Sequence, residues 1–142
     1  MRGAQDQAIG RSRGGLTTKI HIAVDALGNP LRLIATAGQV HDSTQAEALV
    51  EDFDAAHVIA DKAYDNNEFR AFLAFRSDAV IPSRVSRTEP IPHDQHRYKE
   101  RHLVECFINK IKHFRRFATR YDKTVASFLS FAAIAAFMIW LR

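Results

Sequence analysis

Thr18-Lys-Ile-His-Ile-Ala-Val24 alternates apolar with polar or small side chains and is rich in β-branched residues, which predicts a β-strand. The residues that follow, Asp25–Pro30 (DALGNP), are typical of a turn. Leu31–Ala37 (LRLIATA) again has the pattern of a strand, so we expect it to return beside the first strand as a hairpin.

After this hairpin, short apolar runs alternate with stretches of helical periodicity. The first expected helix is capped by Asp42 or Ser43 and runs through Ala46, Leu49, Val50 and Phe53. A strand at His57–Ala60 follows, then a helix from Asn66 to about Phe75 that is capped by Asp65 or Asn66, and then a strand at Ala79–Ile81. The rest of the chain is expected to form a polar loop at about 83–97 and helices at about Arg97–Phe117 and Thr124–Leu141. Such an order predicts an α/β fold, a layered mixed domain that spans residues 1–142 with a loop insertion at about 83–97.

The composition is that of one globular domain. The chain has 142 residues, of which 46% are hydrophobic and 25% are charged. Cys106 is the only cysteine, so an intrachain disulfide is excluded, and the first residues lack the apolar core of a signal peptide. We therefore expect a reducing, cytoplasmic location. Thr124–Leu141 has no charged residue, but its alanines and serines dilute its hydrophobicity, so we expect a core helix buried on all sides rather than a membrane span.

Charge is distributed unevenly along the chain, whose net charge is +4. Residues 1–19 hold four Lys or Arg and one acid, residues 20–80 hold four against ten acids, and residues 97–123 hold nine against three acids. An acidic middle between basic flanks suits a site that binds divalent metal while its rim binds phosphates. A solvated helix face would have the same charges, so charge alone leaves both interpretations open.

One helix predicted near the end of the chain carries a line of polar side chains. At about 100° per residue, one side of this helix presents the residues Tyr98, Arg101, Glu105, Asn109 and Lys112. The opposite side presents apolar residues, namely Leu103, Val104, Phe107, Ile108, Ile111 and Phe114. The carboxylate of Glu105 could bind a divalent cation while the side chains of Arg101 and Lys112 bind phosphates. The alternative is an ordinary amphipathic helix with one charge pair between Arg101 and Glu105.

A second carboxylate, Asp61, directly follows the apolar run His57–Ala60. Open α/β sheets bind ligands just beyond the carboxyl ends of their strands, and Asp61 is expected at such a position. An aspartate that caps a turn would occupy the same place in the sequence, so this alternative also stays open.

Taken together, the two segments resemble bacterial insertion-sequence DDE transposases, the group of insertion-sequence families four and five. Tyr98-(2)-Arg101-(3)-Glu105-(6)-Lys112 matches their Y-(2)-R-(3)-E-(6)-K signature, and Asp61-Lys62-Ala63-Tyr64 is similar to the block around their second catalytic aspartate. The resemblance extends over nearly the whole chain, through further similar stretches at Gly10–Lys19, Val24–Pro30, Gly38–Ser43 and Arg116–Lys123.

The resemblance implies a ribonuclease-H-like fold and a triad of two aspartates and one glutamate that binds two Mg²⁺ ions, with Mn²⁺ as a substitute. Its activity would be DNA strand cleavage and strand transfer by two-metal phosphoryl transfer. Asp61 would be the second acid and Glu105 the third, both of them metal ligands and catalytic. The expected DNA-binding residues are Tyr98, Arg101 and Lys112 from the signature, and the basic Arg115, Arg116 and Arg120. The implied partners are transposon-end and target DNA, further copies of the chain, and an upstream transposase segment or full-length transposase; no membrane partner is expected.

The first aspartate of the family pattern has no clear counterpart. It belongs upstream of Gly10, where Asp6 is the only acid and has no strand-like context. Asp25 and Asp42 have their own places in the pattern, as turn and cap residues. We therefore expect the first ligand and the first strand to be absent, as in a truncated or frameshifted partial product.

Two other functions remain as alternatives at this stage. One is a non-catalytic DNA-binding or regulatory transposase fragment, and the other is an unrelated metal nuclease of the same fold. The histidines His93, His96 and His102 lack the spacing of a common zinc site, so we expect none there.

Overall fold

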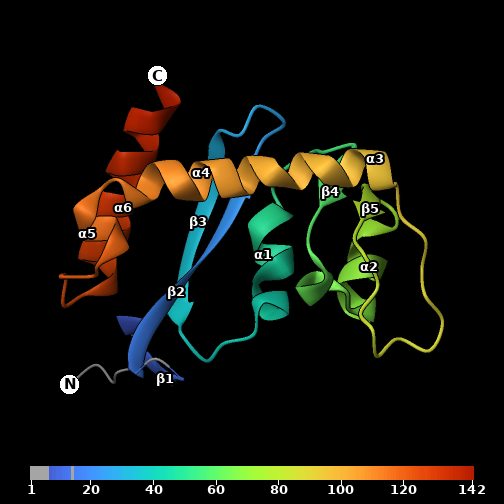
Figure 1. Ribbon diagram of the computed structural model, residues 1–142, viewed down its shortest axis with the longest axis horizontal. Helices are drawn as coiled ribbons and strands as arrows, with labels where there is room; N and C mark the ends of the chain where they lie inside the picture. The colour runs from blue at the N-terminus through green and yellow to red at the C-terminus, as the bar shows by residue number, and fades with distance from the viewer. Residues whose placement is uncertain (1–6, 14) are drawn as a thin grey trace. The chain divides into compact units, whose positions relative to one another are not determined.

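The computed structural model describes residues 7–13 and 15–142, so the position of Asp6 lies outside the described residues. The chain folds into a mixture of strands and helices, which confirms the predicted mixed α/β class (Figure 1). It divides into two compact units, the first formed by residues 1–40 with 103–142 and the second by residues 41–102. Each unit has its own buried apolar cluster.

The first unit is built on an antiparallel sheet in the order β1-β2-β3. Its strands are β1 (Gly10–Ser12), β2 (Gly15–Val24) and β3 (Pro30–Ala37). The predicted hairpin is confirmed as β2 and β3, with Ile22 opposite Leu33. Its turn is closed by the Asp25 carboxylate, which accepts hydrogen bonds from the backbone of Leu27 and Asn29 at 2.8 and 2.9 Å. The short strand β1 was not predicted.

The first unit also contains the helices α4 (His102–Lys112), α5 (Arg115–Ala118) and α6 (Val125–Trp140). The apolar cluster joins α4 and α6 to one face of the β2–β3 hairpin, through Phe107, Ile111, Ala135, Ala136, Ile22, Val24 and Leu33. The alternation of β2 explains this arrangement, because Ile22 and Val24 point to the same face of the strand.

The start of the single helix predicted over about Arg97–Phe117 is confirmed to within two residues, but its end is wrong. The helix begins with α3 (Gln95–Tyr98), where the Asp94 carboxylate accepts hydrogen bonds from two backbone amides. It ends at Lys112, because Phe114 has an extended backbone, with φ −79° and ψ 107°, before α5 starts. Phe114 still packs on the apolar cluster of the first unit. The break therefore lets the chain change direction without losing that apolar contact.

The last helix, α6, forms where predicted but is not buried on all sides. The Thr124 hydroxyl caps it by accepting from the Ser127 backbone at 3.2 Å. The side chains that face the interior are mostly small, namely Phe128, Ala132, Ala135 and Ala136. Several large side chains of α6 are exposed, namely Ile134, Phe137, Met138 and Trp140, and so is Leu141 directly after the helix. Among the described residues, no helix combines the length and apolar character needed to cross a membrane.

The second unit contains a two-stranded parallel sheet, β4 (His57–Ile59) and β5 (Asp78–Val80), connected through α2 (Asn67–Leu73). Its remaining elements are α1 (Ala46–Val50), α3, and the 3₁₀ turns η2 (Asp42–Gln45), η3 (Lys62–Tyr64) and η4 (Lys99–Arg101). The buried core consists of Ala46, Phe69, Leu73 and Ile81. The two predicted strands are confirmed to within a residue or two.

The caps of the second unit were predicted in part. Asn66 caps α2, since its side chain accepts a hydrogen bond from the Phe69 backbone amide at 2.6 Å. Of the two predicted caps for this helix, Asp65 and Asn66, the second is therefore confirmed. Asp42 and Ser43 do not cap the first helix of this unit. They lie inside η2, whose N-cap is His41, and α1 ends at Val50 rather than reaching Phe53.

Candidate functional site

Asp61 lies just beyond the carboxyl end of β4, where the sequence placed it. Its backbone is extended, with φ −78° and ψ 173°, and its Oδ1 accepts a hydrogen bond from the Ala63 backbone at 2.8 Å. Asp61 is therefore the N-cap of η3, so the interpretation as a capping aspartate is confirmed. A cap residue is held in one orientation, so the carboxylate has a defined position at the strand end.

The charges of two carboxylates act on the hydroxyl of Tyr64. Burial, together with the negative charges of Asp42 and Asp61, raises the pKa of Tyr64 to about 12. The turns that carry these residues, η2 and η3, also contact each other. The second unit thus gathers negative charge beside Asp61, a feature that the sequence did not predict because Asp42 and Asp61 are far apart in the chain.

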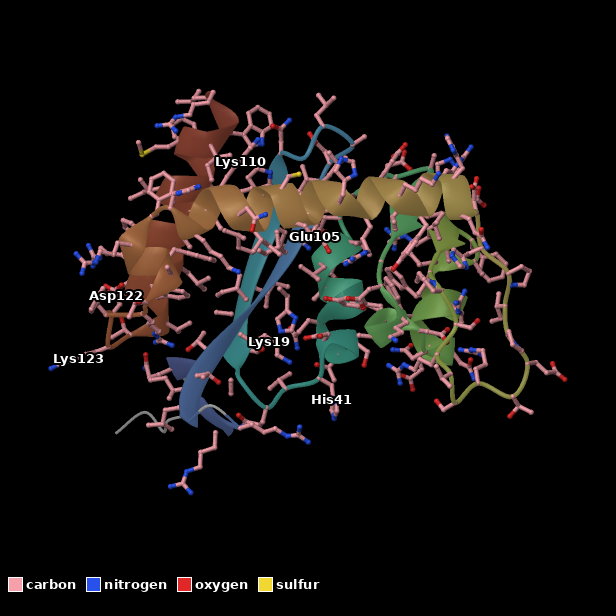
Figure 2. The ribbon with its side chains drawn as sticks, viewed as in Figure 1. Lys19, His41, Glu105, Lys110, Asp122 and Lys123 are labelled. Atoms are coloured by element: carbon pink, nitrogen blue, oxygen red, sulfur yellow. The ribbon has the colours of Figure 1, made fainter. Side chains whose placement is uncertain are left out.

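Glu105 is an exposed residue of α4, projecting from the helix (Figure 2). The opposite side of α4 is buried through Phe107 and Ile111, whose exposed fractions are 1% and 0%. Lys112, the last residue of α4, is also exposed. The predicted division of this helix into a polar and an apolar side is therefore confirmed.

The two earlier residues of the signature lie in the second unit. Tyr98 ends α3 and Arg101 ends η4, and both side chains are partly buried. The Arg101 guanidinium carbon lies 5.9 Å from the centre of the Tyr98 ring, within the range of a cation–π contact. Asp61 also belongs to the second unit, whereas Glu105 and Lys112 belong to the first. That the carboxylates of Asp61 and Glu105 converge on one metal site therefore stays a prediction.

The basic residues after α4 differ in what they contact. Arg115 is exposed. Arg116 pairs with Asp122 at 2.7 Å, and its guanidinium carbon lies 5.0 Å from the centre of the Phe131 ring. The exposed side chains of Lys110 and Lys123 add positive charge to the same unit (Figure 2).

Arg120 binds the start of the chain. Its Nη1 donates to the Gln7 carbonyl at 2.9 Å and to the Thr18 hydroxyl, and its Nε donates to the Asp122 carbonyl at 3.1 Å. Burial lowers the pKa of Arg120 from its ordinary value, while the Asp122 charge acts in the opposite direction. A phosphate would have to compete with these contacts for the Arg120 guanidinium.

The donor chemistry of Asp61 and Glu105 fits a hard divalent cation, because carboxylate oxygens are the ligands that Mg²⁺ prefers. Within residues 7–13 and 15–142, no group of three or more His, Cys, Asp or Glu side chains is arranged to hold a metal ion.

Asp65 has a structural role that sequence reasoning missed, having treated it only as a possible cap. It is buried, and its carboxylate accepts from Arg70 Nε at 2.6 Å, Arg87 Nη2 at 2.8 Å and the Arg84 backbone at 2.8 Å. Burial alone would raise the pKa of Asp65, but these hydrogen bonds outweigh it and hold the pKa well below its usual range. Asp65 thereby fixes the loop after β5, which lines an open cavity of about 740 Å³ beside it. Of its partners only Arg70 is close in the sequence, so a charge pair between Asp65 and Arg70 was the one local signal for this role.

Comparisons with known proteins agree with the residue pattern. A family model described as the transposase DDE domain matches residues 2–141. A Brucella ovis protein assigned as a transposase for insertion sequence element IS6501 is 45% identical over 130 residues, which cover 89% of this chain and all of that protein. A Burkholderia cepacia protein assigned as a transposase for IS402 is 33% identical over 126 residues, which cover 80% of this chain and 56% of that protein.

No solved structure matches the chain significantly. The family model spans nearly every residue, and the alignment with the Brucella ovis protein is close to complete for both chains. The chain therefore belongs to the transposase DDE domain family of bacterial insertion sequences, which acts on DNA and generally uses divalent metal ions.

Proposed function

We propose that this chain contributes Asp61 and Glu105 to the metal site of an insertion-sequence transposase, which cleaves DNA strands and joins them to a target. The observation that carries the proposal is the polar side of α4, where Glu105 is exposed opposite the buried Phe107. Asp61, held by its cap at the end of β4, would be the second ligand.

Each remaining residue of the signature has a part that follows from its chemistry. Arg101 can bind a phosphate through two parallel hydrogen bonds, and Lys112 can bind one as a point charge. Tyr98 lies under Arg101 and limits the orientations of its guanidinium. When bound, Mg²⁺ or Mn²⁺ would supply activation of the attacking oxygen and stabilisation of the leaving oxygen at phosphorus.

The fold proposed for the complete domain is ribonuclease-H-like, with residues 1–142 as one catalytic domain. The antiparallel hairpin followed by a parallel strand pair and covering helices supports this proposal.

The first aspartate of the triad is proposed to come from sequence other than the described residues. The Asp25 carboxylate is used by its turn, where it accepts from Leu27, Asn29 and the Asn29 side chain. Asp42 belongs to η2, and the family pattern assigns it to a stretch of its own, Gly38–Ser43. Since no third carboxylate completes a metal group among residues 7–13 and 15–142, a non-catalytic DNA-binding or regulatory role is the second candidate function.

A strand-cleavage assay on transposon-end DNA with Mg²⁺ or Mn²⁺ separates these functions. The proteins are this chain and the same chain preceded by an aspartate-bearing strand, each also with Asp61→Asn, Glu105→Gln or the control Glu89→Gln. Cleavage by the extended chain that only Asp61→Asn and Glu105→Gln abolish supports the catalytic proposal. Cleavage that survives Glu105→Gln refutes its role as a ligand, and DNA binding without cleavage by any protein supports the regulatory role.

A further inference from the structure

The β1–β2 hairpin presents a basic tip that the proposed catalytic site does not use. Ser12 pairs with Gly15, so only two residues separate the paired ends of the strands. Arg11 in β1 and Arg13 in the connection are both exposed. Residues 7–24 contain no aspartate or glutamate, so the positive charge of this segment is not balanced within it.

The base of this hairpin is held firmly to the rest of the first unit. The Thr18 hydroxyl donates to the Ala8 carbonyl at 2.6 Å, and the Gly38 amide donates to the Thr17 carbonyl at 3.1 Å. A Cβ at Gly38 would collide with the Thr17 side chain, so the backbones approach here as closely as glycine permits. Arg120, which follows α5 in the chain, donates a hydrogen bond to the Gln7 carbonyl. The base of the hairpin is therefore anchored at several points, which lowers the entropic cost of binding a partner.

An exposed leucine lies beside the arginines. Leu16 is directly opposite Arg11 in the antiparallel pair, so the two side chains project from the same face of the ribbon. Leu16 is 73% exposed, although it could have been polar without loss to the core. The ribbon therefore combines cationic hydrogen-bond donors with an apolar side chain at one end of β2. The β2–β3 turn lies at the other end (Figure 1).

We propose that the β1–β2 hairpin is a DNA-contacting arm, with Arg11 and Arg13 binding phosphates or guanine edges and Leu16 packing against sugars or thymine methyl groups. A two-stranded ribbon is narrow enough to enter the major groove, where these contacts are available together. Arginine suits both phosphate and guanine because its planar donors bind either through two hydrogen bonds. The inference rests on the proposed function only in taking DNA as the ligand, and it is independent of Asp61 and Glu105.

Fluorescence anisotropy with the whole chain and labelled transposon-end duplex tests the arm. We expect Arg11→Ala and Arg13→Ala each to weaken binding several-fold and to reduce the slope of log affinity against log salt by about one, as the loss of one phosphate contact requires. Arg142→Ala removes the same charge from an exposed site at the other end of the chain and is the matched control. Binding by Arg11→Ala and Arg13→Ala that equals binding by Arg142→Ala overturns the arm while leaving the proposed function intact. If the unaltered chain does not bind DNA even at low salt, the arm and the proposed function both fail.

A photo-crosslinking amino acid gives a readout that does not depend on lost charge. It is placed at Leu16 or, as a control, at Leu27, which is 82% exposed in the β2–β3 turn. Both side chains are exposed, so neither replacement disturbs the core. We expect irradiation to join DNA to the protein through position 16 and not through position 27. Equal crosslinking at both positions, or crosslinking at 27 alone, contradicts the arm.

Discussion

Arg87 and Asp65 form an ion pair in which Arg87 Nη2 lies 2.8 Å from Asp65 Oδ1, and the carboxylate is completely buried. Arg70 binds the same oxygen at 2.6 Å, so one carboxylate joins α2 to the loop that follows β5. A buried carboxylate with these partners cannot be removed without leaving positive charge uncompensated.

We expect Asp65→Asn to lower the free energy of unfolding by about 3 kcal/mol, because the arginines around the buried carboxylate would lose the negative charge that compensates them. Urea denaturation followed by circular dichroism measures the change. Glu89→Gln alters an exposed carboxylate of the same loop and should change the stability by less than about 0.5 kcal/mol. A similar small effect for Asp65→Asn would show that the loop does not depend on this pair.

The depressed pKa of Asp65 predicts an acid-sensitive contribution to stability. An aspartate whose pKa is lower in the folded than in the unfolded state stabilises the fold above the unfolded value of about 4, and this contribution declines as the pH falls toward the folded value. The stability difference between the unaltered chain and Asp65→Asn should therefore be constant near neutral pH and shrink below about pH 4. Urea denaturation at several pH values measures it, and a difference that does not change with pH would contradict the assignment.

Arg120 and Arg115 should affect different properties of the protein. Arg120→Ala leaves the Gln7 carbonyl without its donor, so we expect a loss of about 1–3 kcal/mol in unfolding free energy. Arg115 is exposed, so Arg115→Ala should preserve stability and weaken DNA binding. Thermal unfolding and anisotropy on the same samples compare the two. If thermal unfolding showed Arg120→Ala and Arg115→Ala to be equally stable, the structural role assigned to Arg120 would be wrong.

DNA binding by the chain should depend strongly on salt, because binding to several phosphates releases counterions. We expect the double variant Arg115→Ala and Arg116→Ala to reduce the salt slope by about two, since each phosphate contact contributes about 0.9. Anisotropy titrations from low to physiological salt measure the slope. Affinity that is independent of salt would exclude a phosphate-binding role for these arginines.

Much of the fold could be predicted because local patterns determined it. The alternation of β2 and the turn chemistry of Asp25 specify the hairpin without reference to any other segment. The polar and apolar sides of α4 follow in the same way from helical periodicity, as does the Asn66 cap of α2. In each case the residues that decide the structure are within a few positions of one another.

The features that the sequence did not predict depend on distant residues. Phe114, where the helix breaks, packs on the first unit's cluster, and the exposure of Trp140 depends on which side of α6 meets α4 and the hairpin. Asp65 gathers arginines from two segments, one of them about 20 positions away. The positions of Asp61 and Glu105 on their elements were predicted because each depends only on its own segment.

Asp61 and Glu105 are proposed to bind one metal site, and a crystal structure of the chain with Mn²⁺ and transposon-end DNA would locate the metal relative to both carboxylates. Two ligands of a shared site must converge, so the carboxylates should lie roughly 4–8 Å apart, with an anomalous Mn²⁺ peak about 2.0–2.6 Å from an oxygen of each. The matched crystal of Glu105→Gln should lose or weaken that peak. Carboxylates on opposite faces of the domain, or a Mn²⁺ peak that contacts neither of them, would contradict the assignment.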